Sequence, residues 1–263
     1  MSAFFSRILV ALVLLPAVLG LAYVGGWWWF ALGGLASLIA LHEFWLLARA
    51  NAPLALAGYI GTALTLVGAK VGGFEWMVGG LLVTLPLAFY LKVVSRARQA
   101  PTAAISTTVL GPAWVGLGVA FLLLLRALPD HGRLAIFTVL LAVWAGDTLA
   151  YFGGRLFGRH KMAPATSPGK TWEGFVFGTA ATIFVAFVAL YKQHYLSIGD
   201  SIVLGVVIAV AAPLGDLFES LLKRDAGVKD SGRLLGGHGG MLDRLDAFLF
   251  AAPAAYLTII ALT

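Results

Sequence analysis

Long apolar stretches alternate with short polar connections along almost the whole chain. A transmembrane helix needs about 20 consecutive apolar residues. The stretches predict about nine such helices, at residues 8–24, 27–48, 53–69, 74–91, 105–127, 133–154, 174–191, 201–222 and 245–262. A membrane barrel does not fit, because barrel strands alternate apolar and polar positions over about 10 residues. We therefore predict an all-α, polytopic membrane protein.

The same pattern predicts a simple organisation of the chain. The division between the third and fourth helices rests on one short polar break, KVGGFE at residues 70–75. The first stretch has one Arg and an apolar core, as a signal peptide does. The apolar run continues into WWWF at residues 27–30, however, so a retained first helix fits better. We expect one membrane domain over residues 1–263, with N-terminal helices in 1–128 and catalytic helices and cytoplasmic loops in 129–263.

Composition supports the same class of protein. Of the 263 residues, 60% are hydrophobic and 11% are charged, and the mean hydropathy is +0.94. Soluble domains carry about 25% charged residues, so this class is excluded. Cysteine is absent, which excludes disulfides and thiolate metal sites. The net charge of +6 is modest, and we expect no nucleic-acid partner.

The placement of Lys and Arg predicts the orientation, because cytoplasmic connections of membrane proteins carry an excess of these residues. With the nine predicted helices, fourteen Lys and Arg residues fall on one side and four on the other, which accounts for all eighteen. The side with fourteen should be cytoplasmic, which places the N-terminus inside and the C-terminus outside. On that side, residues 92–101 (KVVSRARQAP) are basic without acids, and we interpret them as a topology determinant beside anionic headgroups.

Carboxylates lie inside or at the edge of predicted helices near the cytoplasmic face: Asp147, Asp216, Glu219 and Asp246, with Asp243 one helical turn before Asp246. Intramembrane charges cost about 2.5–3.5 kcal/mol each and are functional by default. Converging carboxylates repel one another unless a cation intervenes, and Mg²⁺ takes one or two carboxylates plus substrate phosphates. The alternative for each is an ion pair, for example Asp243 with Arg224 or Arg233. Glu43, near the inner end of the second helix, either snorkels or joins the same site.

Residues 220–246 (SLLKRDAGVKDSGRLLGGHGGMLDRLD) gather both signs of charge between two apolar helices. Lys223, Arg224 and Lys229 suit phosphate, with Arg as a bidentate fork and Lys as a point charge. In the GGHGG run at residues 236–240, glycine permits close backbone approach, and successive N–H groups can cradle phosphate oxygens. A flexible connector is the alternative for the glycines alone, but the flanking charges favour phosphate. His238 binds metal, donates to phosphate or holds the loop.

A second polar segment, SPGKTWEG at residues 167–174, contains the letters GKT. A phosphate-binding P-loop needs GxxxxGK[ST] after a strand, and Pro164 stands where its first glycine would be. We therefore reject that interpretation and expect a helix to begin here instead. Thr171 either caps this helix or faces a substrate together with Lys170.

Residues 220–246 resemble the diagnostic segment of the phosphatidate cytidylyltransferases, also called CDP-diacylglycerol synthases. The matching positions are Ser220, Lys223, Arg224, Lys229, Asp230, Gly232, Leu235, His238, Gly239, Gly240, Asp243, Arg244 and Asp246. DTLAYFGGR at residues 147–155, the segment at 167–174 and the multi-span layout resemble the same family. The resemblance covers the C-terminal half firmly, whereas the first helices match only in hydrophobicity.

This resemblance implies transfer of the cytidylyl group of CTP to phosphatidic acid, giving CDP-diacylglycerol and pyrophosphate at the cytoplasmic face of the cell membrane. We expect one or two Mg²⁺ ions as cofactor, and we assign three sets of residues. The catalytic set is Lys223, Arg224, Lys229, Asp230 and Arg244. The substrate-binding set is Lys170, Thr171, Ser220, His238, Gly239 and Gly240. The metal ligands are Asp216, Asp243, Asp246 and Asp147, and Asp230 either binds metal or orients Lys229.

Two rival functions come from other classes. Another CTP-dependent lipid enzyme, such as a lipid-alcohol kinase or an ether-lipid cytidylyltransferase, would need a similar polar site. A transporter fits less well, because transporter sites lie near the bilayer midplane and the charges here cluster at one face. Small residues such as GGLAS at 33–37 permit close helix packing within one chain or between two copies, so a homodimer stays open.

Overall fold

The computed structural model describes residues 3–95, 100–191, 193, 195–232 and 239–263, and side chains from residue 13 onward. Two compact units are distinguished. The first contains Met1–Ala127 with Asp225–Leu245, and the second contains Leu128–Arg224 with Asp246–Thr263. The predicted subdivision near residue 128 coincides with a unit boundary, but the polar segment 225–245 groups with the N-terminal helices. The expectation of one membrane domain stays a prediction.

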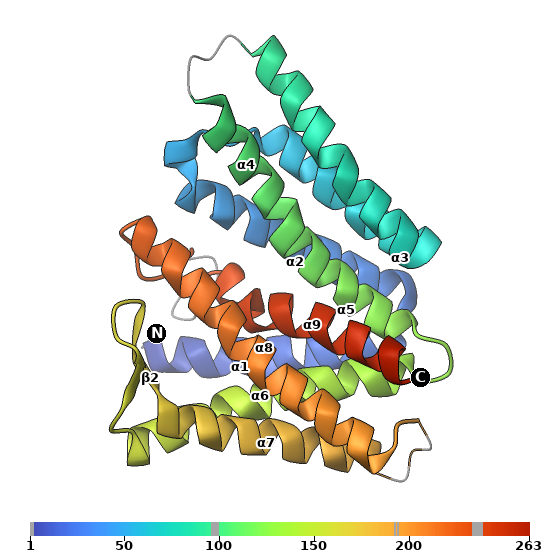
Figure 1. Ribbon diagram of the computed structural model, residues 1–263, viewed down its shortest axis with the longest axis vertical. Coiled ribbons are helices and arrows are strands. Elements are labelled where there is room, and N and C mark those ends of the chain that lie inside the picture. Colours follow the sequence, from blue (N-terminus) through green and yellow to red (C-terminus); the bar gives the residue numbers. More distant parts are fainter. Residues whose placement is uncertain (1–2, 96–99, 192, 194, 233–238) are drawn as a thin grey trace. The chain divides into compact units, whose positions relative to one another are not determined.

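The first unit is built from helices that the apolar stretches predict (Figure 1). A continuous helical segment runs from Pro101 to Ala127. It begins four residues before the predicted start at residue 105. Proline is well suited to a first helical turn, because its missing N–H has no intrahelical partner there. The elements are α1 (Ala3–Val24), α2 (Gly26–Leu47), a 3₁₀ turn (Arg49–Asn51), α3 (Ala55–Val94), α4 (Pro101–Gly111), a π-helical turn (Pro112–Gly116) and α5 (Leu117–Ala127).

The element α3 is a helical hairpin rather than one straight helix. Gly73 has φ 71° and ψ −151°, which breaks the helical backbone and which glycine adopts readily. The two arms then pack against each other. A Cβ on Gly61 would collide with Thr84 and one on Gly68 with the backbone of Trp76, so glycine at these positions permits the close approach. The predicted polar break at residues 70–75 therefore contains the observed one.

Hydrogen bonds from Arg126 secure the end of the first helix of this unit. Arg126, near the end of α5, donates from Nε to the carbonyl of Ala22 at 2.6 Å and from Nη2 to that of Tyr23 at 2.9 Å. The last carbonyls of a helix have no intrahelical partner and carry partial negative charge. The guanidinium therefore stabilises the C-terminal end of α1.

The second unit packs its helices closely through small residues. Its helices α6 (Gly132–Phe157) and α7 (Trp172–Leu190) lie side by side (Figure 1), and Thr182 Oγ1 donates to the Ala142 carbonyl at 3.2 Å. A Cβ on Gly178 would lie 2.9 Å from the Gly146 carbonyl oxygen, so glycine is what permits this spacing. The remaining elements are β1 (Lys161–Ala163), β2 (Ser167–Thr171), α8 (Ile198–Asp225) and α9 (Leu242–Leu262), the last of which begins in the first unit.

A short β-hairpin departs from the all-α expectation. Strands β1 and β2 pair antiparallel, with Lys161 opposite Thr171 and Ala163 opposite Ser167. The sequence analysis missed them because strands of three and five residues offer too little periodicity, and the pairing across the turn decides their conformation. The expected helix start is confirmed at Trp172, with Thr171 as N-cap accepting from the Gly174 N–H at 3.1 Å.

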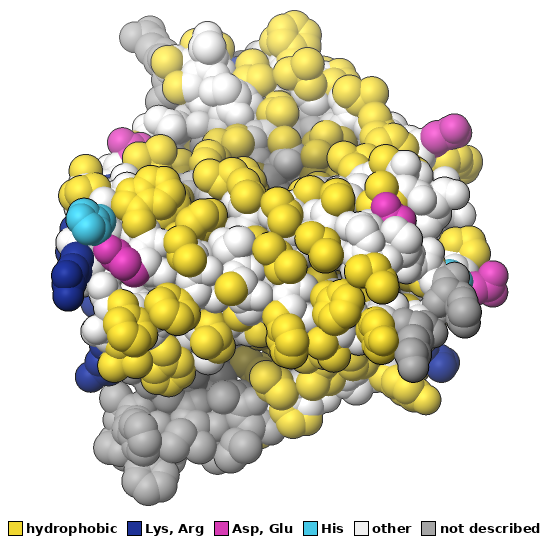
Figure 2. Space-filling model, turned by 60° about the horizontal axis from the view of Figure 1, so that its bottom comes forward, with side chains coloured by type: hydrophobic (Ala, Val, Ile, Leu, Met, Phe, Trp, Pro, Cys, Tyr) yellow, Lys and Arg dark blue, Asp and Glu magenta, His cyan; other side chains and the backbone are white. Residues whose placement is uncertain are grey.

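Seven helices in the described part of the chain are long and apolar enough to cross a membrane, and Val13–Val24 is a shorter apolar helix. Their outer faces carry large apolar side chains, among them Trp28 and Trp76, which are 67% and 65% exposed. In Figure 2, hydrophobic side chains are spread over the face shown, and most of the charged ones lie toward its margins. Exposed apolar surface on this scale marks a lipid-facing protein. The chain is therefore a multi-pass membrane protein.

Candidate active site

Acidic side chains from three helices converge in the second unit. Asp216 and Glu219 lie one turn apart in α8, Asp246 lies in α9 and Asp147 in α6. Asp246 is partly buried and is close enough to the other three to feel their negative charges. Glu219 is fully buried, at 0% exposed. The structure thus brings together three carboxylates assigned to metal from the sequence, with Glu219 as a fourth.

Two lysines partly neutralise this acidic group. Lys170, at the end of β2, places Nζ 3.0 Å from Asp216 Oδ2 and donates to the Pro213 carbonyl at 3.2 Å. Lys223, in the last turn of α8, contacts Glu219 Oε2 at 2.5 Å. The β-hairpin therefore serves to hold Lys170 against α8. Two of the four carboxylates, Asp216 and Glu219, are thus held in ion pairs with lysines.

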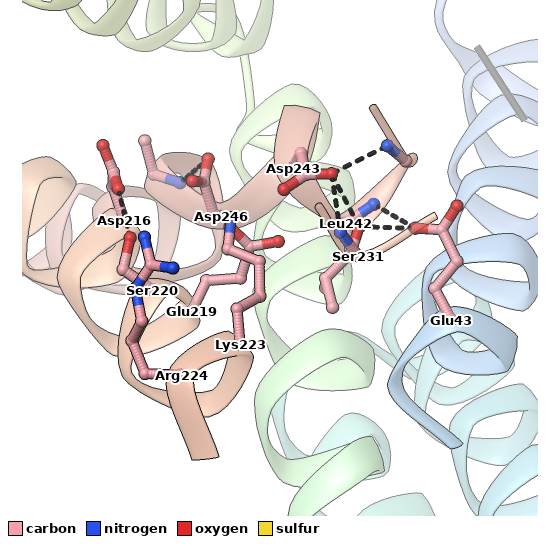
Figure 3. Close-up of polar contacts among 12 residues, drawn as sticks. Glu43, Asp216, Glu219, Ser220, Lys223, Arg224, Ser231, Leu242, Asp243 and Asp246 are labelled. Atoms are coloured by element: carbon pink, nitrogen blue, oxygen red, sulfur yellow. Dashed lines mark hydrogen bonds and ion pairs between the residues drawn. The ribbon is translucent and has the colours of Figure 1, made fainter. Parts of the chain in front are cut away.

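Two further predicted residues lie on the same face of α8 (Figure 3). Ser220 Oγ donates to Asp216 Oδ1 at 3.2 Å, which orients that carboxylate from one turn below. Arg224 donates from Nε to the Thr166 carbonyl at 3.1 Å, so it ties the tip of the hairpin to the end of α8. In the structure both therefore position other groups of the site.

The helices α8 and α9 cross at a glycine. A Cβ on Gly215 would lie 2.3 Å from the Asp246 carbonyl oxygen and 3.1 Å from its carbonyl carbon. Only glycine lets the two backbones approach this closely. Gly215 thereby sets the depth at which Asp246 sits beside Asp216, a role that the sequence analysis did not assign.

In the first unit, Asp243 organises the polar segment that precedes α9. Its Oδ2 accepts from the Ser231 N–H at 3.0 Å, from Ser231 Oγ at 2.9 Å and from the Gly240 N–H at 2.7 Å. Gly239 has φ 79°, and a Cβ there would lie 2.6 Å from Asp243 Oδ2. The Gly240 N–H, expected to face a phosphate, is thus engaged by Asp243 in this structure.

Glu43 belongs to the same network and is buried, at 4% exposed. Its Oε1 accepts from the Met241 N–H at 3.0 Å, and its Oε2 from the Leu242 N–H at 2.8 Å and from Ser231 Oγ at 3.0 Å (Figure 3). The side chain does not snorkel to the surface. The sequence analysis left both roles open, because nothing local to α2 indicates partners about 190 positions away.

The comparison with known proteins decides the family. The profile of the Cytidylyltransferase family matches residues 5–262. This chain belongs to the cytidylyltransferase family. Among its relatives, the phosphatidate cytidylyltransferase of Staphylococcus haemolyticus is 34% identical over 97% of this chain and 98% of its own length. That of Mycobacterium bovis is 36% identical over 88% of this chain and 80% of its own length, and that of Haemophilus influenzae is 44% identical over 48% and 45%. The resemblance inferred from residues 220–246 is confirmed and extends to the first helices.

The hydrogen bonds and ion pairs described above do not include several of the residues assigned in this cytidylyltransferase. Lys229 and Asp230 are exposed after α8, and Arg244 is exposed in the first turn of α9. His238 lies outside the described residues, as does Arg233. Their assigned roles stay predictions.

The carboxylates also bear on a metal ion. Among the described residues, no group of three or more His, Asp or Glu side chains is arranged to hold a metal by itself. Mg²⁺, however, is usually bound by one or two carboxylates, with phosphate and water oxygens completing its coordination. The carboxylates of Asp216 and Asp246, which lie within electrostatic reach of each other, therefore fit a magnesium ion that arrives with a nucleotide.

Proposed function

We propose that this protein transfers the cytidylyl group of CTP to phosphatidic acid, giving CDP-diacylglycerol and pyrophosphate. One observation carries the proposal. In a chain of this family, whose relatives are named phosphatidate cytidylyltransferases, four carboxylates from membrane-spanning helices meet Lys223 of α8 and Lys170 of the β-hairpin. A lipid phosphate can reach such a position while its acyl chains remain in the bilayer.

The acidic group is the proposed magnesium site. Asp216 and Asp246 are the proposed ligands, with Asp147 beside them and Asp243 as a further candidate. Bound Mg²⁺ would neutralise charge on the phosphates of CTP. Lys170 and Ser220 hold Asp216 from two sides and so fix the direction of its carboxylate. Lys223 compensates Glu219, which would otherwise be a costly buried charge.

The reaction demands little acid–base chemistry of the protein. An oxygen of the phosphatidate phosphate, ionised at neutral pH, forms a bond to the α-phosphorus of CTP. The bond from that phosphorus to the bridging oxygen breaks, and pyrophosphate leaves with the electron pair. In-line positioning and charge neutralisation therefore supply most of the acceleration. The proposed phosphate contacts are Lys223 and Arg224, in the last turn of α8, together with Lys229 and Arg244.

We further propose nine membrane crossings, with the N-terminus in the cytoplasm. The seven long apolar helices count as eight when the two arms of α3 are separated at Gly73, and α1 is the ninth. The excess of Lys and Arg on alternate connections supports a cytoplasmic active site, where CTP is found. Membrane lipid surrounds the helices. A homodimer stays a prediction. A Cβ on Gly33 would lie 3.0 Å from Val119, so this glycine packs against its own chain.

A label-transfer assay tests the function. Purified protein in detergent receives phosphatidic acid, Mg²⁺ and CTP labelled at the α-phosphate, and label in the lipid phase is counted. We expect Asp246→Asn to lower the rate more than about 100-fold, because charge stabilisation at a metal site is worth several kcal/mol. Asp130→Asn is the matched control, since Asp130 is exposed at φ 56°, a conformation that Asn tolerates well.

The rival functions give different outcomes in the same assay. Transfer of label from γ-labelled CTP, without transfer of α-label, would replace the proposal with a CTP-dependent lipid kinase. The absence of both transfers in folded protein would reject an enzyme of this class. Full activity of Asp246→Asn would refute the assignment of that residue to the metal.

A further inference from the structure

Glu43 is a buried carboxylate that the proposed reaction does not use. It projects from α2 and accepts three hydrogen bonds, all from groups between Ser231 and Leu242. Burying a charge without partners is costly, and hydrogen bonds to a charged group are stronger than those between neutral groups. A fully engaged carboxylate in this position has a strong orienting effect on its donors.

Two of these donors are the backbone N–H groups at the start of α9. The first N–H groups of a helix have no intrahelical partner, and this end of a helix attracts negative charge. Ordinarily a residue just before the helix supplies the cap. Here Glu43, from a different helix, accepts from Met241 and Leu242 at 3.0 and 2.8 Å. The position of α9's first turn is therefore fixed to α2.

The third donor links Glu43 to Asp243. Ser231 Oγ lies 3.0 Å from Glu43 Oε2 and 2.9 Å from Asp243 Oδ2. A hydroxyl has one proton to donate, so the two carboxylates share this donor. The two carboxylates therefore bind Ser231 on one side and Gly240, Met241 and Leu242 on the other. We call Glu43, Ser231 and Asp243 the carboxylate clamp.

Glycines at two positions make room for the clamp. A Cβ on Gly232 would collide with Glu43 Oε1, and a Cβ on Gly240 would collide with Glu43 Oε2 and Ser231 Oγ. The backbone thus approaches the carboxylate more closely than any side chain allows. These glycines serve the Glu43 carboxylate, whereas the sequence analysis expected Gly240 to approach a phosphate.

We propose that Glu43 is a positioning residue for cytidylyl transfer, which acts through the carboxylate clamp by fixing Ser231, Gly240 and the first turn of α9. This inference rests on the proposed function. It assigns Glu43 no contact with substrate. The Met241 and Leu242 N–H groups already donate to Glu43, so they are not available to a substrate phosphate. Their hydrogen bonds instead fix the position of the first turn of α9 during the reaction.

The test compares Glu43→Gln with Glu75→Gln in full-length protein in detergent. Gln has the same shape but presents an NH₂ group to donors that need an acceptor. Glu75 is an exposed carboxylate at the turn of α3 and is a matched control. Two quantities are measured: kcat per folded molecule in the label-transfer assay, and hydrogen–deuterium exchange of the peptide containing Met241 and Leu242.

We expect Glu43→Gln to speed exchange at residues 241–242 and to lower kcat about 10- to 100-fold, the effect of a displacement near 1 Å. A purely structural role would reduce the amount of folded protein and leave kcat per folded molecule unchanged. Glu75→Gln should change neither quantity.

The double variant Glu43→Gln/Ser231→Ala should lower kcat by less than the product of the two single effects, because both act through one clamp.

Three outcomes would overturn the proposal: an unchanged kcat per folded molecule, unchanged exchange at residues 241–242, or multiplicative single effects. A wild-type protein that transfers no label would reject the proposed function and the positioning role with it. Faster exchange in Glu43→Gln would still establish the carboxylate clamp in that case, so the two failures are distinguishable.

Discussion

Replacing Gly215 by Ala should disable the enzyme at little cost in stability. In the second unit, the added Cβ would lie 2.3 Å from the Asp246 carbonyl oxygen, whereas ordinary contact begins at 3.4 Å. The Cβ is attached to the backbone of α8 and the oxygen belongs to the backbone of α9, so no flexible side chain can move to relieve the clash. The crossing of α8 and α9 must therefore open by about 1.1 Å (3.4 − 2.3).

Two opposing terms decide the stability of this variant. Overpacking a close contact costs about 1–3 kcal/mol. Alanine is more favourable than glycine inside a helix by about 1 kcal/mol. The free energy of unfolding should therefore fall by only about 0–2 kcal/mol. A shift of about 1 Å at Asp246, by contrast, is expected to lower the rate about 100-fold, so activity is the decisive measurement.

The assay is label transfer to phosphatidic acid at saturating CTP, with the unfolding midpoint followed by tryptophan fluorescence. Gly199→Ala is the control, because it lies in the first turn of α8 and its Cβ would meet Ser197 Oγ at an ordinary 3.7 Å. Wild-type turnover in Gly215→Ala would refute the argument that this crossing sets the position of Asp246.

The remaining predictions concern cations. Lys170→Met removes the 3.0 Å ion pair with Asp216, which is partly exposed, so unfolding free energy should fall by only about 0.5–1 kcal/mol. Its turnover should fall at least about 10-fold because the acidic group loses a compensating charge; equal rates in Lys170→Met and the exposed control Lys161→Met would contradict this. Arg126→Met should destabilise the protein by about 1–2 kcal/mol through lost hydrogen bonds to α1. Its kcat should not change, and a lower kcat in folded protein would show that Arg126 has a further role.

Much of the candidate site was accessible to the sequence because its signal is local. Asp216 and Glu219 are one helical turn apart, and the cluster of charges after α8 stands out against apolar surroundings. The same local reasoning failed for Gly215. A glycine inside an apolar helix looks like any other small residue until the neighbouring helix is known.

The hydrogen-bond partners of two acidic residues were also not predicted from the sequence. The metal role of Asp243 stays a prediction, and the structure adds that its carboxylate accepts hydrogen bonds from Ser231 and Gly240. Glu43 had no local feature to distinguish snorkelling from a site role. Its contacts, to groups about 190 residues later, exist only in the folded chain.

The sequence by itself determined the membrane class, the apolar segments and the family, because hydrophobic length and closely spaced motifs are properties of neighbouring residues. The tertiary structure alone decided which groups meet. It placed Lys170 on Asp216 through a β-hairpin, brought α8 against α9 at Gly215 and joined Glu43 to the start of α9. Hydrogen bonds and close backbone contacts act over a few ångströms in space, regardless of separation along the chain, so no local pattern encodes their partners.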